Sequence, residues 1–323
     1  MKYTVTGGAG FIGSSLVDEL IERGHEVIVI DNLVSGKEEN INPKAKFILA
    51  DINGCRFGSQ LSSCTDKVIE AVKGSDSIFH LAALARVQPS IDNPVRFHDA
   101  NVNGTLNILM LARELGIRRV IYSASSSAYG NATIFPTPET HPTDPMSPYG
   151  LQKLIGEQYC KIFSRCYDLE TVCLRYFNVF GQRQDPGGQY AAVIPKWIDA
   201  ILNDKEVFIN GDGSTTRDFC YIDNAIQANI LAAMTENQEA LNQIYNIAAN
   251  YQISLNELHK IIQKSISKLK PELINNEPIY RDFRPGDIMH SRADIGKAEK
   301  LLGYKATKSV KQGLEELIEL ECK

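Results

Sequence analysis

Short apolar runs alternate with amphipathic stretches along most of this chain. After the first run, Ile12, Leu16 and Leu20 recur at the spacing of one helical face. Buried strands that alternate with such helices predict an α/β fold built on a doubly wound parallel sheet. We predict strands at 2–6, 25–30, 46–50, 75–83, from 119 onward, 170–175 and 243–248. Helices are predicted after Gly13, at about 94–115, from 148 onward, and at 224–234, 254–269 and 309–321.

The pattern changes beyond residue 176, where alternation weakens and loops rich in Gly, Pro and Gln appear, as at 181–188. A chain of 323 residues also exceeds the ~250–300 residues at which a single core usually stops growing. We therefore expect a first lobe of residues 1–176, to which 221–248 return. A smaller C-terminal substrate-binding lobe would then comprise 177–220 and 249–323.

The composition limits the cellular compartment and the binding partners that we expect. The net charge is −5 and no basic run is present, which argues against nucleic acid as a partner. No apolar run approaches the ~18–20 residues that span a membrane, so no membrane partner is expected. Met1 leads directly into a strand-like segment, and the seven cysteines lack a secretory context. We expect a cytoplasmic protein with reduced thiols and, without Cys-x-x-Cys or His-x-x-x-His spacing, no metal.

A glycine-rich loop, Gly7-Gly-Ala-Gly10-Phe-Ile-Gly13, joins the first strand to the first helix. Glycines let the backbone turn tightly and approach a pyrophosphate, whose charge is favoured at a helix N-terminus. Asp31 follows the second strand, 18 residues after Gly13, where its carboxylate can accept hydrogen bonds from both ribose hydroxyls. This arrangement predicts a Rossmann-type domain that binds NAD in preference to NADP.

Later strand ends add to this cofactor site. Asp51 and Ile52 follow the third strand, where they can flank an adenine, and small residues after the fourth strand allow close approach of a cofactor. We interpret His80 as a packed strand-end residue. The predicted cofactor-binding residues are Gly7, Gly10, Phe11, Ile12, Gly13, Asp31, Asn32, Asp51, Ile52, Leu81, Ala82, Ala83, Asn101, Tyr149 and Lys153.

The stretch Ser147-Pro-Tyr-Gly-Leu-Gln-Lys153 has the form of a helix start, with Ser147 as N-cap and Pro148 in the first helical position. Tyr149 and Lys153 are four residues apart and share a helix face. An ammonium close to a phenol lowers a pKa that starts at about 10, which yields a base able to take a hydroxyl proton. A serine from the cluster that follows the strand at 119 can hydrogen-bond the same hydroxyl.

In this order, the glycine loop, Asp31, the serine cluster and the Tyr149/Lys153 pair resemble the extended short-chain dehydrogenase/reductases along the whole chain. The resemblance is closest to the UDP-hexose 4-epimerases, particularly those acting on UDP-N-acetylglucosamine. It rests on 124–130 (Ala-Ser-Ser-Ser-Ala-Tyr-Gly), 175–181 (Arg-Tyr-Phe-Asn-Val-Phe-Gly), 189–197, 210–219 and 284–291. It implies Ser125, Tyr149 and Lys153 as catalytic residues, and a homodimer formed through the helices near 95–115 and 149–165.

The same resemblance implies a substrate site. Asn178 would lie beside the sugar and diphosphate, Arg217 and Arg284 on the phosphates, and Asp287 on the uridine ribose. Forked guanidinium donors suit phosphate. Trp197 could equally belong to the core. The implied substrate-binding residues are Ala85, Arg86, Ser125, Ser126, Asn178, Ala192, Val193, Lys196, Trp197, Phe208, Asn210, Arg217, Arg284, Asp287 and Ser291.

The implied reaction is 4-epimerisation of UDP-N-acetylhexosamines by transient oxidation at C4, because the small Ser291 leaves room for an N-acetyl group. UDP-glucose and UDP-galactose are a second substrate pair. A UDP-uronic acid 4-epimerase stays open, since Arg86 can pair with a carboxylate. A 4,6-dehydratase needs a carboxylate pair where Ser126 and Ser127 stand. A non-catalytic NAD(H)-binding sensor has no need for the set Ser125, Tyr149 and Lys153.

Overall fold

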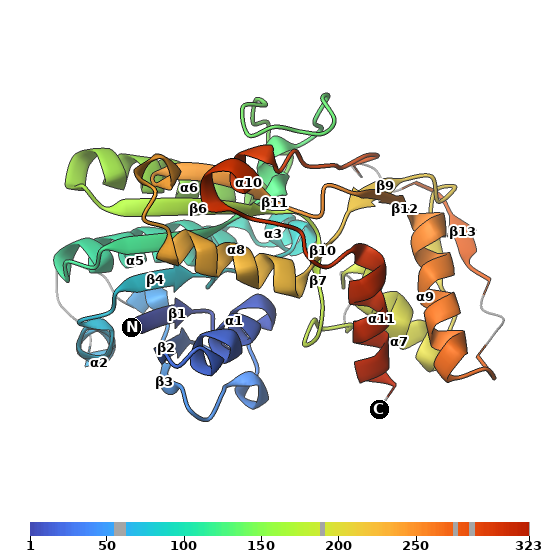
Figure 1. The fold of residues 1–323 in the computed structure, drawn as a ribbon, viewed down its shortest axis with the longest axis horizontal. Coiled ribbons are helices and arrows are strands. Elements are labelled where there is room, and N and C mark those ends of the chain that lie inside the picture. The colour runs from blue at the N-terminus through green and yellow to red at the C-terminus, as the bar shows by residue number, and fades with distance from the viewer. Residues whose placement is uncertain (55–62, 188–190, 274–276, 284–287, 323) are drawn as a thin grey trace.

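The computed structural model of the chain describes residues 1–54, 63–187, 191–273, 277–283 and 288–322 (Figure 1). Two residues expected in the substrate site, Arg284 and Asp287, lie outside these ranges, as does most of the polar segment that precedes residue 63.

A seven-stranded sheet forms the centre of the molecule, and every pairing in it is parallel. The predicted doubly wound parallel sheet is therefore confirmed. The predicted strand 75–83 is shorter in the structure, so residues 81–83 lie beyond the sheet edge. In spatial order the strands are β11 (Gln243–Ile247), β6 (Glu170–Tyr176), β5 (Arg119–Ser125), β4 (Ser77–His80), β1 (Lys2–Thr6), β2 (Glu26–Asp31) and β3 (Lys46–Leu49).

Helices cover both faces of this sheet because alternate strand residues point to opposite sides. Along β2, Val27 and Val29 join the core with α1 and α8, whereas Ile28 and Ile30 join the core with α2, α5 and α6. The helix expected at 94–115 contains a π-helical segment, Asp99–Asn103, between α4 and α5. The helices of this lobe are α1 (Phe11–Glu22), α2 (Ser63–Val72), α3 (Val87–Asp92), α4 (Pro94–His98), α5 (Gly104–Glu114), α6 (Pro148–Tyr167) and α8 (Ile222–Met234).

The remaining C-terminal elements gather beyond the carboxyl ends of the strands, on the right in Figure 1. Serine capping boxes at Ser254 and Ser309 begin α9 and α11, which pack against each other. The elements are β7 (Val179–Phe180), α7 (Val193–Leu202), β8 (Phe208–Asn210), β9 (Thr216–Asp218), β10 (Cys220–Tyr221), β12 (Gln252–Ser254), α9 (Leu255–Leu269), β13 (Ile279–Arg281) and α11 (Val310–Glu321). The helix α10 (Gly296–Leu302) instead packs against β11 and α8 of the first lobe (Figure 1). Short 3₁₀ turns lie at 38–40, 52–54, 126–129 and 238–240.

Asp218, at the end of β9, ties distant segments of this region together. Its carboxylate is fully buried and accepts hydrogen bonds from the backbone N–H of Ala249 at 3.0 Å and of Ala293 at 3.1 Å. Burial raises the pKa of this carboxyl to about 7, although the backbone donors act in the opposite direction. The segments around 249 and 293 are thereby fixed beside β9.

Candidate active site

The first turn of α6 has the local structure that its sequence predicts. Ser147 caps the helix by accepting a hydrogen bond from the Gly150 N–H at 3.1 Å, and Pro148 occupies the first helical position. The Tyr149 N–H, which has no partner within the helix, donates to Ser90 Oγ of α3 at 3.1 Å. The backbone of Tyr149 is therefore fixed by both α6 and α3.

Tyr149, Lys153 and Ser125 come together at the carboxyl end of β5. Ser125 is the last residue of that strand, and its Oγ accepts the Ser127 N–H at 3.2 Å. Lys153 Nζ donates to the Ser123 carbonyl oxygen at 2.7 Å and lies over the Tyr122 ring. A phenol, a hydroxyl and an ammonium are thus held on adjoining elements, as base chemistry on a substrate hydroxyl requires.

The pKa of Tyr149 is shifted in the direction opposite to the predicted one. Burial raises the pKa of the Tyr149 phenol, and a hydrogen bond from Ser125 lowers it only in part. Burial also lowers the pKa of Lys153 to about 8, while the Glu157 carboxylate acts in the opposite direction. The expectation of a Tyr149 pKa below its ordinary value is therefore wrong for the cofactor-free chain, because desolvation exceeds the effect of the Ser125 hydrogen bond.

The glycine loop is closed against the end of β4. Gly7 has φ +74°, and a Cβ there would lie 2.6 Å from the Ala82 nitrogen. A Cβ on Gly13 would lie 2.1 Å from the Gly7 carbonyl oxygen. A side chain at either position would displace backbone atoms. Glycine is therefore required at both, and the loop 7–13 presents mainly backbone groups at the start of α1.

Asp31 lies at the tip of β2 and is buried. One carboxylate oxygen accepts the Ala9 N–H at 3.0 Å and the other accepts the Leu33 N–H at 2.8 Å. Because an ionised carboxylate can accept about four hydrogen bonds, two positions are left for ribose hydroxyls. Asp51 at the next strand end accepts from Asn32 Nδ2 at 3.0 Å.

Asn101, in the π-helical segment, holds the segment that follows β4. Its Oδ1 accepts the Leu84 N–H at 2.8 Å, and its Nδ2 donates to the Leu84 carbonyl and to Gln152 Oε1, both at 3.0 Å. The side-chain amide of Asn101 therefore fixes the position of the segment 81–85. His80 is a packed residue, as expected, because Thr6 and Thr105 hydroxyls hold both ring nitrogens and burial lowers its pKa to about 3.

A pocket of about 250 Å³ lies among the C-terminal elements, with both residues of β7 in its lining. Arg217 contributes to its wall, with its guanidinium also donating to the Met289 carbonyl at 3.3 Å. Lys196 was expected here but does not line the pocket, because it lies on the exposed face of α7. The expected residues that do line it are Asn178, Ala192, Val193, Trp197, Phe208, Asn210 and Arg217.

Trp197 serves the core and the pocket together. It is 3% exposed, its Nε1 donates to the Phe208 carbonyl at 3.3 Å, and its ring packs edge-on against His259. The Arg281 guanidinium stacks 3.3 Å from the Phe208 ring centroid. That stacking was not predicted, because it depends on the pairing of β13 with β8.

Gln184 lines the pocket but was not among the predicted substrate-binding residues. Its Nε2 donates to the Val179 carbonyl at 3.1 Å, while its Oε1 is buried and has no hydrogen-bond partner within the described part of the chain. A buried acceptor without a donor costs about 1–3 kcal/mol, so a ligand donor in the pocket would relieve that cost. The other unpredicted lining residues are apolar: Val179, Phe180, Ile194, Ile209, Phe219 and Leu255.

The other predicted substrate residues are distributed around the mouth of the site. Ser126 begins the 3₁₀ turn after β5 and Ala85 is exposed beyond β4. Arg86 lies 3.5 Å from Asp185, Nη2 to Oδ2. Ser291 is half-buried, in a segment whose Met289 carbonyl accepts the Thr216 N–H at 3.0 Å.

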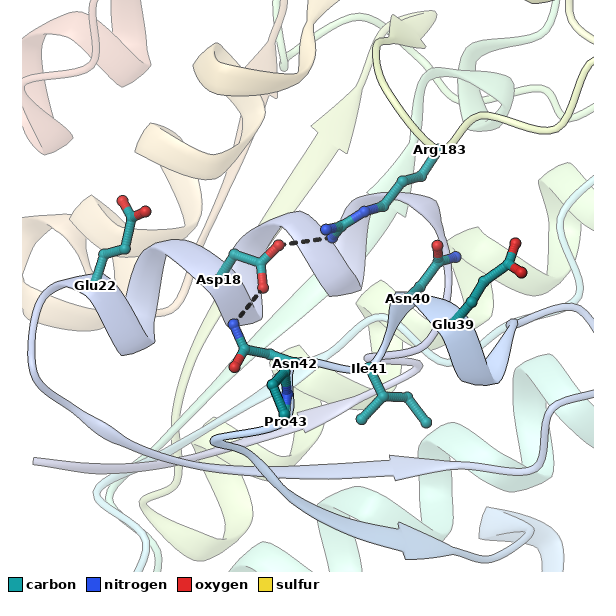
Figure 2. A pocket seen from close by; sticks show the side chains of 8 residues that line it. All are labelled: Asp18, Glu22, Glu39, Asn40, Ile41, Asn42, Pro43 and Arg183. Atoms are coloured by element: carbon teal, nitrogen blue, oxygen red, sulfur yellow. Dashed lines mark hydrogen bonds and ion pairs between the residues drawn. The ribbon is translucent and has the colours of Figure 1, made fainter. Parts of the chain in front are cut away.

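A second pocket lies between α1 and the segment that follows β2 (Figure 2). Its central feature is Asp18, which accepts from Asn42 Nδ2 at 2.7 Å and pairs with Arg183 Nη1 at 2.7 Å. These contacts connect α1 to the segment after β2 and to the loop at 181–187. The lining residues are Asp18, Glu22, Glu39, Asn40, Ile41, Asn42, Pro43 and Arg183.

Within the described residues, no group of His, Cys, Asp or Glu side chains is arranged to hold a metal ion. None of the described helices is long and apolar enough to cross a membrane.

Comparison with known proteins identifies the family. The model of the NAD dependent epimerase/dehydratase family matches residues 3–248. The chain belongs to this family. A putative UDP-glucose 4-epimerase of Methanocaldococcus jannaschii is 40% identical over 315 residues, 97% of this chain and 96% of that protein. The crystal structure of the Thermotoga maritima UDP-glucose 4-epimerase with UDP-glucose has a TM-score of 0.89 and 38% identity, covering 99% and 98% of the two chains.

A second solved structure of this epimerase/dehydratase family carries a different sugar nucleotide. It is the UDP-N-acetylglucosamine 4-epimerase of Methanobrevibacter ruminantium in complex with UDP-N-acetylmuramic acid. The TM-score is 0.88 and the identity 38%, with 98% of this chain and 97% of the other covered. Likeness over nearly the full length of both relatives shows that this chain is an enzyme of the family with NAD as its cofactor.

The residues of the glycine loop fit that cofactor. Glycine at positions 7 and 13 allows the tight backbone packing of the loop that precedes α1, and the first-turn N–H groups of Phe11 and Ile12 can donate to a pyrophosphate there. Asp31 retains acceptor positions for ribose hydroxyls. NAD supplies reversible hydride acceptance, while the chain supplies binding, orientation and the proton-transferring groups.

Proposed function

We propose that this chain interconverts the 4-epimers of UDP-N-acetylhexosamines, UDP-GlcNAc and UDP-GalNAc, with UDP-Glc and UDP-Gal as a slower pair. One observation carries the proposal. Ser125 pairs in register with Tyr176 of β6, and Asn178, two residues further on, lines the nucleotide-sized pocket. The catalytic hydroxyls and the pocket therefore adjoin, as a sugar attached to a bound nucleotide requires.

The proposed roles follow from this geometry. Tyr149 takes the proton of the sugar 4-hydroxyl, with Ser125 hydrogen-bonded to the same oxygen, and NAD bound at the glycine loop would supply the reversible hydride acceptance. Lys153 supplies positive charge that favours the phenolate. Arg217 and the pocket hold the UDP group, so the oxidised sugar can turn over and recover hydride on its other face. No net oxidation occurs.

The choice of N-acetylhexosamines rests on the small side chain of Ser291. That residue lies between Met289 and Ala293, which hydrogen-bond to Arg217 and Asp218 respectively. Its segment is therefore fixed beside the residue proposed to contact phosphate. A hydroxymethyl group there leaves space for an acetamido arm in either sugar orientation. The relative with UDP-N-acetylmuramic acid bound supports this choice, because its ligand also carries a substituted 2-position.

A UDP-uronic acid 4-epimerase is the second candidate, because Arg86 offers a guanidinium to a sugar carboxylate. In the structure that guanidinium pairs with Asp185, so a uronate would have to displace a carboxylate of the protein. A dehydratase lacks support, because Ser126 and Ser127 occupy the 3₁₀ turn after Ser125 where that chemistry needs acids.

We further propose a homodimer formed through α4, α5 and α6. Large apolar side chains are exposed along or beside these helices, among them Ile91, Val95, Leu151 and Ile162, with Val95 71% exposed. Burial of such a surface against a second copy would remove it from water. Light scattering on the purified protein should give twice the 35.9 kDa chain mass. The mass of a single chain would contradict the dimer.

The function is tested by incubating the NAD-loaded protein separately with UDP-GlcNAc, UDP-Glc and UDP-GlcA and following the anomeric and H4 signals by NMR. The proposal expects the 4-epimer of UDP-GlcNAc to form fastest, without accumulation of NADH. Fastest conversion of UDP-GlcA would establish the uronate alternative, and loss of the 6-hydroxyl would establish a dehydratase.

A further inference from the structure

Lys153 is an ammonium buried in an environment that favours its neutral form. The side chain is 3% exposed, and its Nζ donates to one backbone carbonyl, that of Ser123. The Tyr122 ring lies beneath it and His80 is neutral nearby. A cation buried in this way needs a compensating negative charge.

Glu157 supplies that charge from one turn further along α6. It lies on the same helix face as Lys153, four residues on, and is 1% exposed. The carboxylate accepts both arms of the Arg175 guanidinium, Oε1 from Nε at 2.7 Å and Oε2 from Nη2 at 2.6 Å. This bidentate contact fixes the orientation of the Glu157 carboxylate and favours its charged form.

Arg175 is itself held from the opposite side. Its guanidinium lies 4.5 Å from the centroid of the Tyr129 ring, and the Tyr129 hydroxyl donates to Asn246 Oδ1 at 2.7 Å. Asn246 is the register partner of Arg175 on β11, and its Nδ2 donates to the Thr137 and Asp294 carbonyls. A buried chain of contacts therefore runs from Glu157, one helical turn beyond Lys153, across the sheet.

Burial favours the neutral forms of Glu157 and Lys153, and their neighbours oppose it. Burial raises the pKa of the Glu157 carboxyl, while the hydrogen bonds and charge of Arg175 act in the opposite direction. The Glu157 carboxylate in turn opposes the lowering of the Lys153 pKa by burial. The titratable and charged groups that face this pair are Tyr149 and Cys160 of α6, Tyr122 of β5, His80 of β4, Cys173 and Arg175 of β6, and Tyr129.

We propose that Glu157, clamped by Arg175, is a positioning residue that keeps Lys153 cationic beside Tyr149 and so sets the pH range in which Tyr149 can act as base. The inference rests on the proposed function only in assigning Tyr149 as base. An Arg–Glu pair that merely joined α6 to β6 would stabilise the fold and leave the ionisation of Lys153 unchanged.

The test variant is Glu157→Gln, which keeps shape and one acceptor but removes the charge. Lys153 should then lose its proton at a pH lower by roughly one unit. The basic limb of the profile of kcat/KM against pH, where Lys153 loses its proton, should move to lower pH by the same amount. An NMR titration of the lysine side chains in the cofactor-free protein, with Lys153→Gln as the subtracted reference, should show the Lys153 shift without any turnover.

Glu170→Gln is the matched control. Glu170, at the start of β6, bonds to the fully buried Arg119 at the start of β5, so this variant also weakens an Arg–Glu pair, at the opposite end of these strands from Ser125. It should lower the melting temperature and leave the pH profile and the Lys153 titration unchanged. Arg175→Lys, which keeps one charge without the fork, should shift both by less than Glu157→Gln does.

Equal profiles for Glu157→Gln and Glu170→Gln would overturn the inference. So would a Lys153 titration in Glu157→Gln that matches the wild-type protein. If Glu157→Gln does not fold, Arg175→Lys decides by the same two measurements. Absence of epimerisation with every sugar would refute the proposed function and leave the Lys153 titration as an independent result.

Discussion

Arg86 and Asp185 form an ion pair, Nη2 to Oδ2 at 3.5 Å, between the segment after β4 and the loop after β7. Arg86 has φ +147°, a backbone conformation that costs a non-glycine residue about 1–3 kcal/mol. Four residues further on, Ser90 accepts the Tyr149 N–H, and beside Asp185, Gln184 lines the nucleotide pocket. The pair thus lies between the proposed base and the proposed UDP site, where the sugar would be.

The first prediction concerns the Arg86–Asp185 ion pair and the charge of the substrate sugar. Asp185→Asn should free the Arg86 guanidinium and raise kcat/KM for UDP-GlcA relative to UDP-GlcNAc by about two- to fivefold, the equivalent of an exposed ion pair. Parallel initial-rate assays with both sugars measure the ratio. Adding Arg86→Ala to Asp185→Asn should remove the gain. An unchanged ratio in Asp185→Asn would mean that Arg86 does not contact the sugar.

The second prediction concerns Tyr149. Tyr149→Phe removes one hydroxyl from a side chain held by packing, so the melting temperature and NAD affinity should stay near wild type. The rate should fall by about 10²–10⁴-fold, as expected for a lost general base. Steady-state assays and NAD titration measure the two quantities. A variant that retains most of its turnover would exclude Tyr149 as the base.

The third prediction concerns cofactor choice. The Asp31 carboxylate should repel a 2′-phosphate, so NADP should bind roughly 10- to 1000-fold more weakly than NAD, given ~1–4 kcal/mol for unit charges about 4 Å apart. Calorimetric titration of cofactor-free protein measures both affinities. Asp31→Ala should narrow the gap mainly by weakening NAD, since it also removes acceptors from the N–H groups of Ala9 and Leu33. Similar wild-type affinities would refute the assignment.

The fourth prediction concerns Asp218 and pH. Its native pKa is about 7, whereas the unfolded value is near 3.8, so between these values the native state holds a proton that the unfolded chain has lost. The group therefore makes stability fall as pH rises from about 4 to about 7. The difference in unfolding free energy between wild type and Asp218→Asn should change by up to about 1.4 kcal/mol per pH unit in that window. Urea unfolding at a series of pH values measures it, and a constant difference would refute it.

The sheet and the start of α6 could be predicted because the sequence patterns that determine them are local. Strands buried on both faces form continuous apolar runs, and the cap and turn residues around 147–153 act within a few positions. The pocket was harder, since β8, β9 and β13 have three residues each and their pairing depends on distant segments. The contacts of Gln184 and Arg281, and the sign of the Tyr149 pKa shift, follow from burial that no local pattern encodes.

The last prediction concerns the 2-position of the sugar. Ser291 is held in place from both sides, because the Met289 carbonyl accepts from Thr216 and the Ala293 N–H donates to Asp218. A tyrosine at 291 cannot escape by moving the segment, so its ring should occupy the space proposed for the acetamido arm. Ser291→Tyr should lower kcat/KM for UDP-GlcNAc by about 10–100-fold, matching the ~1–3 kcal/mol cost of overpacking, and spare UDP-Glc.

Ser291→Ala is the control, since it keeps the volume small and should leave both sugars near wild-type rates. The two substrates are compared by NMR on the same preparations, with melting temperatures to exclude unfolding. Equal losses for both sugars in Ser291→Tyr would show that the residue affects the fold or the UDP group rather than the sugar. Undiminished turnover of UDP-GlcNAc would show that Ser291 does not line the sugar site. The preference for N-acetylhexosamines would then need another cause, and the Arg86 guanidinium would become the leading determinant of substrate choice.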